Sequence, residues 1–441
     1  MSYKHALVRT AWLALIASSG AAYAAPEIQP AGTGDDTARL QAALSGCTNQ
    51  QKACDIRLGA GIFYTDVLLA KGFNGAITGR GQGRTVIRPL AHRPLRSTPL
   101  PFIDEPTLAQ PYPVLLHFAN NSRITISGLT LEFPSSMTVM PYEVPYPGNG
   151  GVVLTDTLVA AILVDGERHT ELKISNVTII GADNDSYDGS NVSSGVRFEG
   201  PIRYSGGVDQ TRKMQRGRIY AFNNRMQRTG YGIQALFANQ VEGLFNGNKM
   251  DVRIYGISIR DLGASKVTAV RNDIDAELSG FLIGESPEQA PATPSDYDIA
   301  WNRIRVNETG LAVDPTGGYA GIGVVQFSTL AEVPVPETFI SDVTLFANDI
   351  TIPEHPVQAG VFVAGDGKSD VRIIGNRIRG APYDTGIFVD ASRGTLIAAN
   401  DLRGVDPPNE DVHLTASTRQ CKVVEPGDTV LDEGTGNQGT H

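Results

Sequence analysis

Hydrophobic and polar residues alternate in short segments along most of the chain, which is the period-two pattern of β-strands. Six of these segments begin with glycine, an apolar residue, any residue and a second apolar residue: "GVRF" at Gly195, "GIQA" at Gly232, "GISI" at Gly256, "GFLI" at Gly280, "GVFV" at Gly360 and "GIFV" at Gly386. No helical period competes over this region. The pattern predicts strands of about five residues, separated by turns that contain asparagine and glycine.

A second marker, asparagine followed by any residue and an apolar residue, recurs between these strands. It begins at Asn176, Asn224, Asn248, Asn272, Asn302, Asn348, Asn376 and Asn400. The clearest spacing is 24 residues, from Asn224 to Asn248 to Asn272. Because one coil of this length cannot bury its own apolar face, the repeat predicts coils that stack as a parallel β-helix. We expect the asparagines to satisfy backbone groups in the turns as a ladder, rather than to bind a ligand.

Three stretches near the N-terminus carry a family resemblance: "GTGDDTARLQAALSGC" from Gly32, "DIRLGAGIFYT" from Asp55 and "GAITGRGQGRTVIRPL" from Gly75. With them the chain resembles the secreted, right-handed single-stranded parallel β-helix proteins of the pectin-lyase-like superfamily, in which a short helix caps the first coil. The resemblance implies an all-β solenoid with a cap over residues 25–60, and with coils and a C-terminal cap over residues 61–441. We expect Thr37 to cap the helix, and Leu40, Ala43 and Leu44 to face the core.

The first residues have the pattern of a secretory signal peptide. Lys4 and Arg9 flank the start of the apolar run from Ala11 to Ala17, and a small-residue triplet follows at residues 22–24. The apolar run is shorter than the roughly 20 residues that a membrane-spanning helix needs, and no later segment approaches that length. We therefore expect residues 1–24 to be removed and the protein to be periplasmic or secreted, without a membrane span.

Charge and cysteine usage restrict the partners and the compartment. The formal net charge is −10, and loss of Lys4 and Arg9 with the signal peptide takes it to −12. This acidic balance argues against nucleic acid and anionic membranes as partners. In an oxidising compartment Cys47 and Cys54 can close a small disulfide loop. Cys421 is left over, and we expect it to be a buried small residue rather than a nucleophile.

Long insertions interrupt the repeat beside the glycine-marked strands. The N-terminal opening and residues 133–155 come just before such strands, whereas residues 285–298 and 328–338 come just after them. Insertions on one face of a solenoid often form a binding face. We therefore expect the glycine-marked sheet to be the floor of a groove that holds a polysaccharide or oligosaccharide. The 48-residue gap between Asn176 and Asn224 has two explanations, an insertion or one extra, degenerate coil.

Alternate residues of the glycine-marked strands should point outward and form columns. Alignment by the glycines places Leu163, Arg197, Gln234, Ser258, Leu282, Phe362 and Phe388 in one column. The next column contains His117, Asp165, Glu199, Leu236, Arg260, Gly284 followed by Glu285, Ala364 and Asp390. Charged and polar side chains thus gather in the N-terminal and middle coils.

Asp165 and Glu199 are the carboxylate pair that we expect to do chemistry. On strands about 4.8 Å apart, two acids could serve as general acid and as nucleophile or base on a glycosidic bond. Arg197 and Arg260 could instead hold a uronate carboxylate or remove the proton α to it. His117 is a candidate proton carrier. The alternative for this set is a group of salt bridges along an exposed sheet.

Four more residues are expected to contact substrate. Gln234 and Glu285 lie on the predicted groove floor, and Tyr142 and Tyr146 lie on a proline-rich loop beside it, where they could stack on sugar rings. Packing of the loop is the alternative for the two tyrosines.

The stretch "DNDSYDG" at residues 183–189 brings Asp183, Asp185 and Asp188 close together. An EF-hand calcium loop needs a glutamate twelve residues from its start, and Ser194 occupies that position, so this motif is excluded. Two interpretations remain, a Ca²⁺ site at the groove edge and a solvated turn rich in aspartate and asparagine.

The resemblance does not select one activity. The superfamily contains lyases, hydrolases, epimerases and non-catalytic proteins, and the motifs of its best-known enzymes do not match: "GDD" occurs only at residues 34–36, "RIR" at residues 303–305 is half a match, and "VDPT" at Val313 lacks a histidine. We expect a carbohydrate-active enzyme that cleaves or modifies an extracellular polysaccharide, as a lyase or glycoside hydrolase. The alternative is a non-catalytic glycan-binding or structural β-helix protein.

Overall fold

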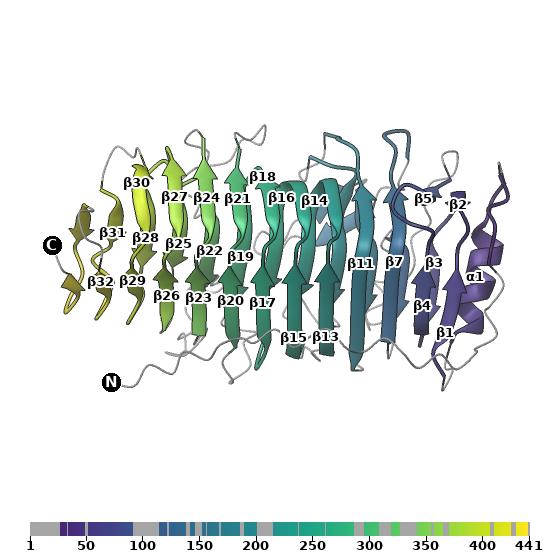
Figure 1. Cartoon of the computed structure of the whole chain (residues 1–441), viewed down its shortest axis with the longest axis horizontal. Coiled ribbons are helices and arrows are strands. Elements are labelled where there is room, and N and C mark those ends of the chain that lie inside the picture. The colour runs from purple at the N-terminus through teal and green to yellow at the C-terminus, as the bar shows by residue number, and fades with distance from the viewer. Residues whose placement is uncertain are drawn as a thin grey trace.

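Three stacks of parallel strands wind around one apolar core in the computed structural model of the chain (Figure 1). The structure describes residues 27–32, 34–48, 52–90, 114–120, 123–137, 142–145, 152–155, 157–166, 169–185, 189–200, 215–236, 238–260, 262–285, 295–307, 319–326, 342–353, 357–364, 370–405, 410–424 and 429–439. The fold is the right-handed single-stranded parallel β-helix that the repeat and the resemblance predicted.

The first two stacks meet at the turn that contains the recurrent asparagines. The first stack contains β1 (Cys54–Arg57), β4 (Asn74–Thr78), the start of β7 (Arg123–Glu132) and of β11 (Thr170–Ile180), β13 (Gln215–Phe222), β15 (Ala238–Asn246), β17 (Lys266–Val270), β20 (Asp296–Ala300), β23 (Asp342–Phe346), β26 (Val371–Ile374), β29 (Leu396–Ala398), β32 (Lys422–Val424) and β34 (Gln438–Gly439). The second stack contains β2 (Gly61–Thr65), β5 (Thr85–Pro89), the ends of β7 and β11, the starts of β14 (Arg225–Leu236) and β16 (Lys249–Arg260), β18 (Asp273–Ala276), β21 (Arg303–Val306), β24 (Asp349–Ile352), β27 (Arg377–Gly380) and β30 (Asp401–Val405).

The third stack carries the glycine-marked strands. It contains β3 (Leu68–Lys71), β6 (Val114–Ala119), β10 (Leu158–Asp165), β12 (Val192–Glu199), the ends of β14 and β16, β19 (Ser279–Glu285), β22 (Ala320–Gln326), β25 (Ala359–Ala364), β28 (Thr385–Asp390), β31 (Val412–Leu414) and β33 (Val430–Asp432). Within the 133–155 insertion, β8 (Tyr142–Pro145) and β9 (Val152–Thr155) form a separate antiparallel pair.

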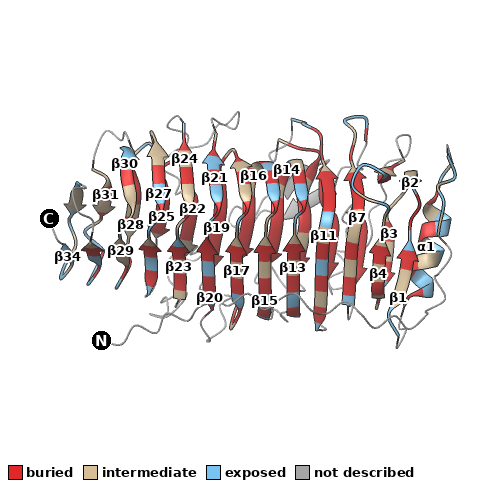
Figure 2. Ribbon diagram, in the orientation of Figure 1, coloured by how far each residue is buried: buried red, intermediate tan, exposed pale blue. Residues whose placement is uncertain are grey.

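Side chains that point inward stack on equivalent side chains of the next coil. Buried residues follow the strands along the helix up to its last coil (Figure 2). In the second stack this column contains Met226, Met250, Ile274, Ile304, Ile350 and Ile378, each no more than 1% exposed. β-Branched side chains suit this position because they fill the pleated surface with few rotamers to lose.

The glycine marker has a packing reason. A Cβ atom at Gly256 would lie 2.4 Å from Cγ2 of Ile274, and one at Gly280 would lie 2.4 Å from Cγ2 of Ile304. The absent side chain thus makes room for the isoleucine of the following coil to pack against the backbone where the chain enters the third stack. Gly321 has the same contact with Ile350, and it begins "GIGV", which fits the marker and adds one segment to the six of the sequence analysis.

A ladder of seven asparagines, six of them buried and the last half-buried, runs along the turn between the first and second stacks. Nδ2 of Asn248 donates to the backbone oxygen of Ala221 at 3.0 Å and to Oδ1 of Asn272 at 2.9 Å, while the backbone N–H of Asn248 donates to the same Oδ1 at 3.1 Å. The same contacts recur at Asn224, Asn272, Asn302, Asn348 and Asn376, and Asn400 ends the series. The predicted ladder is confirmed for these residues.

Asn176 does not belong to the ladder, and its predicted place there is wrong. It aligns with Asn223, and both adopt the left-handed conformation, at φ 53°. The inward position of that coil is Val177, whose backbone N–H donates to Oδ1 of Asn224 at 3.1 Å. Asparagine is common at both places for different reasons, since it tolerates the left-handed conformation and also bonds backbone groups.

A helix, α1 (Thr37–Gly46), covers the end of the solenoid next to β1 and β3 (Figure 1). Leu40 and Leu44 are buried and Ala43 packs against the core, as predicted. The predicted cap is wrong: Asp36 is the N-cap residue and Thr37 is the first helical residue. The hydroxyl of Thr37 instead accepts a hydrogen bond from the backbone N–H of Asp66 at 2.8 Å, which ties the helix to the first coil.

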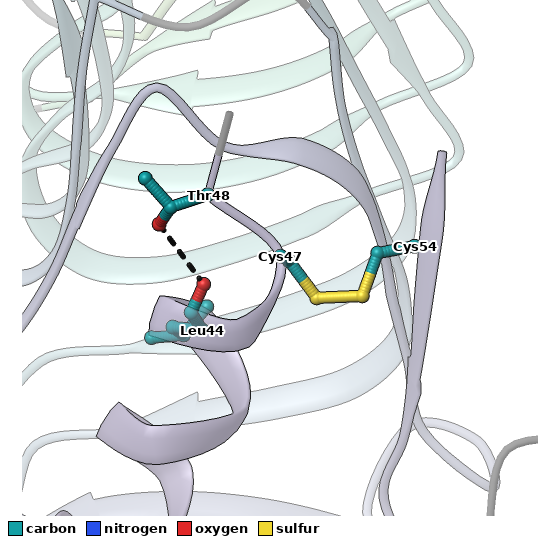
Figure 3. The surroundings of a disulfide bond; sticks show 4 residues. All are labelled: Leu44, Cys47, Thr48 and Cys54. Atoms are coloured by element: carbon teal, nitrogen blue, oxygen red, sulfur yellow. Dashed lines mark hydrogen bonds between the residues drawn. A yellow bond between two sulfur atoms is a disulfide. The ribbon is translucent and has the colours of Figure 1, made fainter. Parts of the chain in front are cut away.

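The predicted disulfide joins Cys47, at the end of α1, to Cys54, at the start of β1 (Figure 3). It closes a loop over seven positions of sequence and links the cap to the first strand. Cys421 is a free, buried cysteine, as expected. Among the described residues, no helix is long and apolar enough to cross a membrane.

The 48-residue gap after Asn176 does not contain an extra coil. β11 pairs directly with β13 in the first stack and with β14 in the second, and β12 pairs with β14 in the third. The coil of Asn176 and the coil of Asn224 are therefore adjacent, and the additional residues belong to turns and insertions. The explanation by a degenerate coil is wrong.

We predict that Asn302→Ala lowers the free energy of unfolding by roughly 2 to 4 kcal/mol, because two donors of Asn272 lose their acceptor in a buried turn. Urea denaturation followed by circular dichroism measures this loss. Asn246→Ala is the matched control, since Asn246 is partly exposed and its side chain forms no hydrogen bond with described residues; it should change stability by less than about 0.5 kcal/mol. Equal stability of the two variants would contradict the structural role of the ladder.

Candidate acid–base site on the third stack

The outer face of the third stack carries the polar side chains that the sequence singled out. One in-register column contains His117, Leu163, Arg197, Gln234, Ser258, Leu282, Gly323, Phe362 and Phe388. The next contains Ala119, Asp165, Glu199, Leu236, Arg260, Gly284, Val325, Ala364 and Asp390. The two predicted columns are confirmed apart from His117, which pairs with Leu163 and therefore lies in the first column. β6 lacks the glycine marker, and a shift of two residues keeps a side chain on the same face, so alternation alone does not define its register.

His117 and Asp165 nevertheless meet across the two columns. Nε2 of His117 lies 3.1 Å from Oδ2 of Asp165, and the residues are 1% and 3% exposed. An ionised carboxylate can only accept, so the imidazole N–H donates to it. The other carboxylate oxygen, Oδ1 of Asp165, is buried and has no hydrogen-bond partner among the described residues. Such an atom is uncommon in folded proteins and calls for an explanation, such as a catalytic role or a bound water.

Glu199 ends β12 in register with Asp165, which places their backbones about 4.8 Å apart on neighbouring strands. Oε2 of Glu199 accepts a hydrogen bond from Nε of Arg197 at 2.7 Å. Burial raises the pKa of Glu199 above its ordinary value of 4.5; the charge of Asp165 adds to this rise, while Arg197 and His117 oppose it. Glu199 therefore keeps its proton to a higher pH than an exposed glutamate does.

Arg197 is the member of this group that reaches solvent, with 23% of its side chain exposed. We call His117, Asp165, Arg197 and Glu199 the acid–base cluster. Two carboxyl groups in different environments, each with one basic partner, can hold their protons to different pH values. One can then act as the proton donor while the other acts as the proton acceptor.

Arg260 and Gln234 lie along the stack beside the cluster. Leu236 stands between Glu199 and Arg260 in their column, so Arg260 is about 10 Å from Glu199 along the stack. Gln234 is the register neighbour of Arg197, and its Oε1 accepts a hydrogen bond from the hydroxyl of Ser194. The structure thus places Gln234 on the strand next to the cluster and Arg260 on the strand after that one.

An aromatic surface follows on the C-terminal coils of the same face. The rings of Phe362 and Phe388 are stacked with centroids 5.2 Å apart, and His413 meets Phe388 edge to face at 5.0 Å. Oε2 of Glu433 lies 3.5 Å from Nε2 of His413. The character of the face therefore changes from ionisable to aromatic along the helix axis.

Several predicted substrate contacts fall outside what the structure describes. Tyr142 begins β8, but its side chain is not among the described ones, and the same is true of Glu285 at the end of β19. Tyr146 and most of the insertions expected to wall the groove lie outside the described residues. Their roles remain predictions.

The acidic stretch before β12 has a different partner from the one expected for a metal site. Asp183 forms an ion pair with Arg253 of β16, which also binds Glu277, so a guanidinium already supplies its counter-charge. Asp185 is exposed, and Asp188 lies outside the described residues. Among the described residues no group of three or more histidine, cysteine, aspartate or glutamate side chains could hold a metal ion. The Ca²⁺ site stays a prediction.

A second polar surface, which the sequence reasoning missed, lies on the outer face of the second stack. A groove of about 380 Å³ is lined there by charged side chains of β14, β16, β18 and β21. The sequence signal for this charged surface is the middle residue of the asparagine triplets. In the seven ladder coils the middle residue of the triplet is charged: Arg225, Lys249, Asp273, Arg303, Asp349, Arg377 and Asp401.

Fold and site together define a parallel β-helix with a buried acid–base cluster on one sheet. The chain is similar to the family 28 exopolygalacturonase of Yersinia enterocolitica, over 91% of this chain and 79% of that one (11% identity, TM-score 0.46). It is also similar to a mannuronan C-5 epimerase A-module of Azotobacter vinelandii, over 93% and 95% (10% identity, TM-score 0.35). A third similar structure is the surface protein and adhesin PfbA of Streptococcus pneumoniae, over 92% and 94% (11% identity, TM-score 0.37).

No protein-family model and no curated protein sequence matches the chain. Because a β-helix hosts unrelated functions, the chemistry of this chain has to follow from its own side chains.

We predict that the free energy of unfolding of Glu199→Gln increases relative to that of the wild type as pH rises from acidic to neutral. The raised pKa means that folded Glu199 holds its proton after the unfolded chain has released it, so the wild type loses stability above pH 4.5 until Glu199 ionises. Each tenfold change in the acid constant corresponds to about 1.4 kcal/mol.

Urea denaturation at a series of pH values measures the difference between variant and wild type. Glu242→Gln, at an exposed carboxyl group of the first stack, is the matched control. Its free energy of unfolding relative to the wild type should not increase from acidic to neutral pH. A constant difference for Glu199→Gln would show that Glu199 titrates as an exposed carboxyl group does.

Proposed function

We propose that the protein is a secreted enzyme that hydrolyses glycosidic bonds of an extracellular polysaccharide at the acid–base cluster. The observation that carries this proposal is the pair of in-register, buried carboxyl groups of Asp165 and Glu199, each with a basic partner. A pair of carboxyl groups at short range is the equipment of most glycoside hydrolases.

Glu199 is the general acid in this proposal. Its raised pKa keeps it protonated under mildly acidic conditions, so that it can give its proton to the oxygen of the leaving sugar. Arg197 holds Oε2 of Glu199 and thereby orients the carboxyl group.

Asp165 is the partner that acts as nucleophile or as base toward water. His117 donates to Oδ2, and Oδ1 is a buried acceptor with no hydrogen-bond partner among the described residues, so a water or hydroxyl group that enters the cluster can donate to it. His117 is itself 1% exposed and is therefore a positioning residue, which fixes the orientation of the Asp165 carboxylate.

Hydrolysis fits this geometry better than β-elimination with arginine as the base. The guanidinium of Arg197 is engaged with Glu199 at 2.7 Å, and a paired guanidinium retains its proton. Arg260, two strands beyond the cluster, binds a neighbouring sugar in this proposal, together with Gln234 on the strand between them.

Secretion is supported by the disulfide between Cys47 and Cys54, because disulfides persist mainly in oxidising compartments. The N-terminal segment with the pattern of a signal peptide lies outside the described residues.

A second candidate function is glycan binding without catalysis. The ring of Phe388, which stacks on the buried Phe362 and lies beside the partly exposed His413, favours it, since aromatic faces pack well on apolar faces of ligands. In this case the acid–base cluster would stabilise the fold only.

We predict that Asp165→Asn and Glu199→Gln each lower turnover by roughly 100- to 10,000-fold while the fold is retained, the range that a lost acid or base costs. Incubation with a panel of extracellular polysaccharides, followed by an assay for new reducing ends, measures turnover. Asp342→Asn, on the outer face of the first stack, is the matched control and should keep full activity.

The outcomes separate the candidates. New reducing ends without ultraviolet absorbance indicate hydrolysis, whereas an unsaturated, absorbing product indicates β-elimination. Full activity of both cluster variants would remove Asp165 and Glu199 from the site. Retention of a glycan without any product across the panel would support the binding function instead.

A further inference from the structure

We propose that the groove on the second stack is a separate binding site for an oligosaccharide that contains uronic acid. The groove, which we call the second-stack groove, crosses β14, β16, β18 and β21. Its outward side chains form two in-register columns of four residues each. They are Arg225, Lys249, Asp273 and Arg303 in the first column, and Gln227, Asp251, Asp275 and Arg305 in the second.

Three cations in the groove are not paired by the fold. The guanidinium groups of Arg225, Arg303 and Arg305 form no ion pair and no hydrogen bond with any residue that the structure describes. The same columns continue into β24 and β27, where Nη2 of Arg379 binds Oδ1 of Asp349 at 2.6 Å. Charge pairing is thus available to this array, but within the groove the one ion pair between described residues joins Nζ of Lys249 to Oδ2 of Asp273 at 3.9 Å.

The carboxylates of the groove are also incompletely compensated. Asp251 and Asp275 face each other in register on neighbouring strands, an arrangement that is unfavourable for like charges. Asp275 is half-buried; its burial and the charge of Asp251 raise its pKa, and Arg305 acts in the opposite direction. Nδ2 of Asn307 donates one hydrogen bond to Oδ1 of Asp275. Further donors between the two carboxylates would relieve this repulsion.

The guanidinium groups and the carboxylates of the groove together indicate the chemical class of the ligand. A guanidinium fork binds a carboxylate with two parallel hydrogen bonds. The carboxylates of Asp251 and Asp275 accept hydrogen bonds from hydroxyl groups. A uronic acid sugar carries a carboxylate and several hydroxyls on one ring, so it satisfies both. The aspartates and the net charge of −10 disfavour the phosphates of nucleic acid.

The shape of the groove also suits a sugar chain. Its volume of about 380 Å³ lies within the usual range of small-molecule sites. The strands that line the groove follow one another at a spacing of about 4.8 Å, so a linear ligand can contact one polar side chain after another along the helix axis. The site faces away from the third stack and does not depend on the proposed hydrolase activity.

The test measures binding of a galacturonate hexamer by isothermal titration calorimetry. The full chain carries Asp165→Asn and Glu199→Gln, so that the acid–base cluster does not consume the probe. In this background we expect the double substitution Arg303→Gln and Arg305→Gln to weaken binding at least about tenfold, since each lost charged hydrogen bond is costly. Arg225→Gln should weaken it severalfold.

Two controls make the result specific. Arg377→Gln lies in the same column outside the groove, where Arg377 faces Asp401 at 3.7 Å, and it should leave affinity within about twofold. A neutral glucose hexamer should not bind. Circular dichroism melting confirms that the exposed substitutions leave the fold intact.

The proposal is overturned if the galacturonate hexamer does not bind, or if it binds equally well to the Arg303→Gln, Arg305→Gln protein. Equal binding would place the sugar elsewhere, including on the third stack. Loss of turnover in the Asp165 and Glu199 variants does not bear on this result, so the two proposals fail separately.

Discussion

The asparagine ladder is the constraint on which the rest of this β-helix depends. Each ladder side chain between the two ends of the series donates to the carbonyl of the coil before it and to the amide oxygen of the coil after it, and it accepts two hydrogen bonds, as Asn248 shows. A change of register by one residue would leave these buried groups unsatisfied, at a cost of about 1 to 3 kcal/mol each. The coils of residues 224–400 are therefore held in register although their lengths differ.

Because the coils are in register, equivalent residues of successive coils form columns. Each column brings together residues that are distant in sequence. Asp165 and Glu199 are neighbours because β10 and β12 are adjacent strands of the third stack, and His117 joins them from the coil before. The same rule places the charged residue after each ladder asparagine on one face of the second stack. A solenoid can thus carry two independent polar surfaces on different sheets, because all three sheets share one backbone register.

The fold was largely predictable from the sequence because its signals are local and periodic. The ladder from Asn224 and the columns from Leu163 onward follow from alternation and spacing, whereas the cap with Leu40 and Leu44 was implied by the family resemblance. The errors arose where two structural causes leave the same residue pattern. Asn176 occupies a left-handed turn position that also favours asparagine. His117 lies on a strand without a glycine marker, where a two-residue shift preserves the alternation.

The candidate site was predictable in its members but not in its electrostatics, and the difference is a matter of burial. Sequence alternation predicts an outward column, and outward residues are ordinarily solvated. Asp165 and Glu199 are 3% and 5% exposed, whereas the guanidinium groups of the second-stack groove stand on an open face. Buried carboxyl groups must find partners or retain protons, which explains why His117 and Arg197 bind them and why the pKa of Glu199 rises. Exposed cations can remain unpaired at little cost, because water solvates them. The fold can therefore keep one set of charges ready for proton transfer and another ready for a ligand.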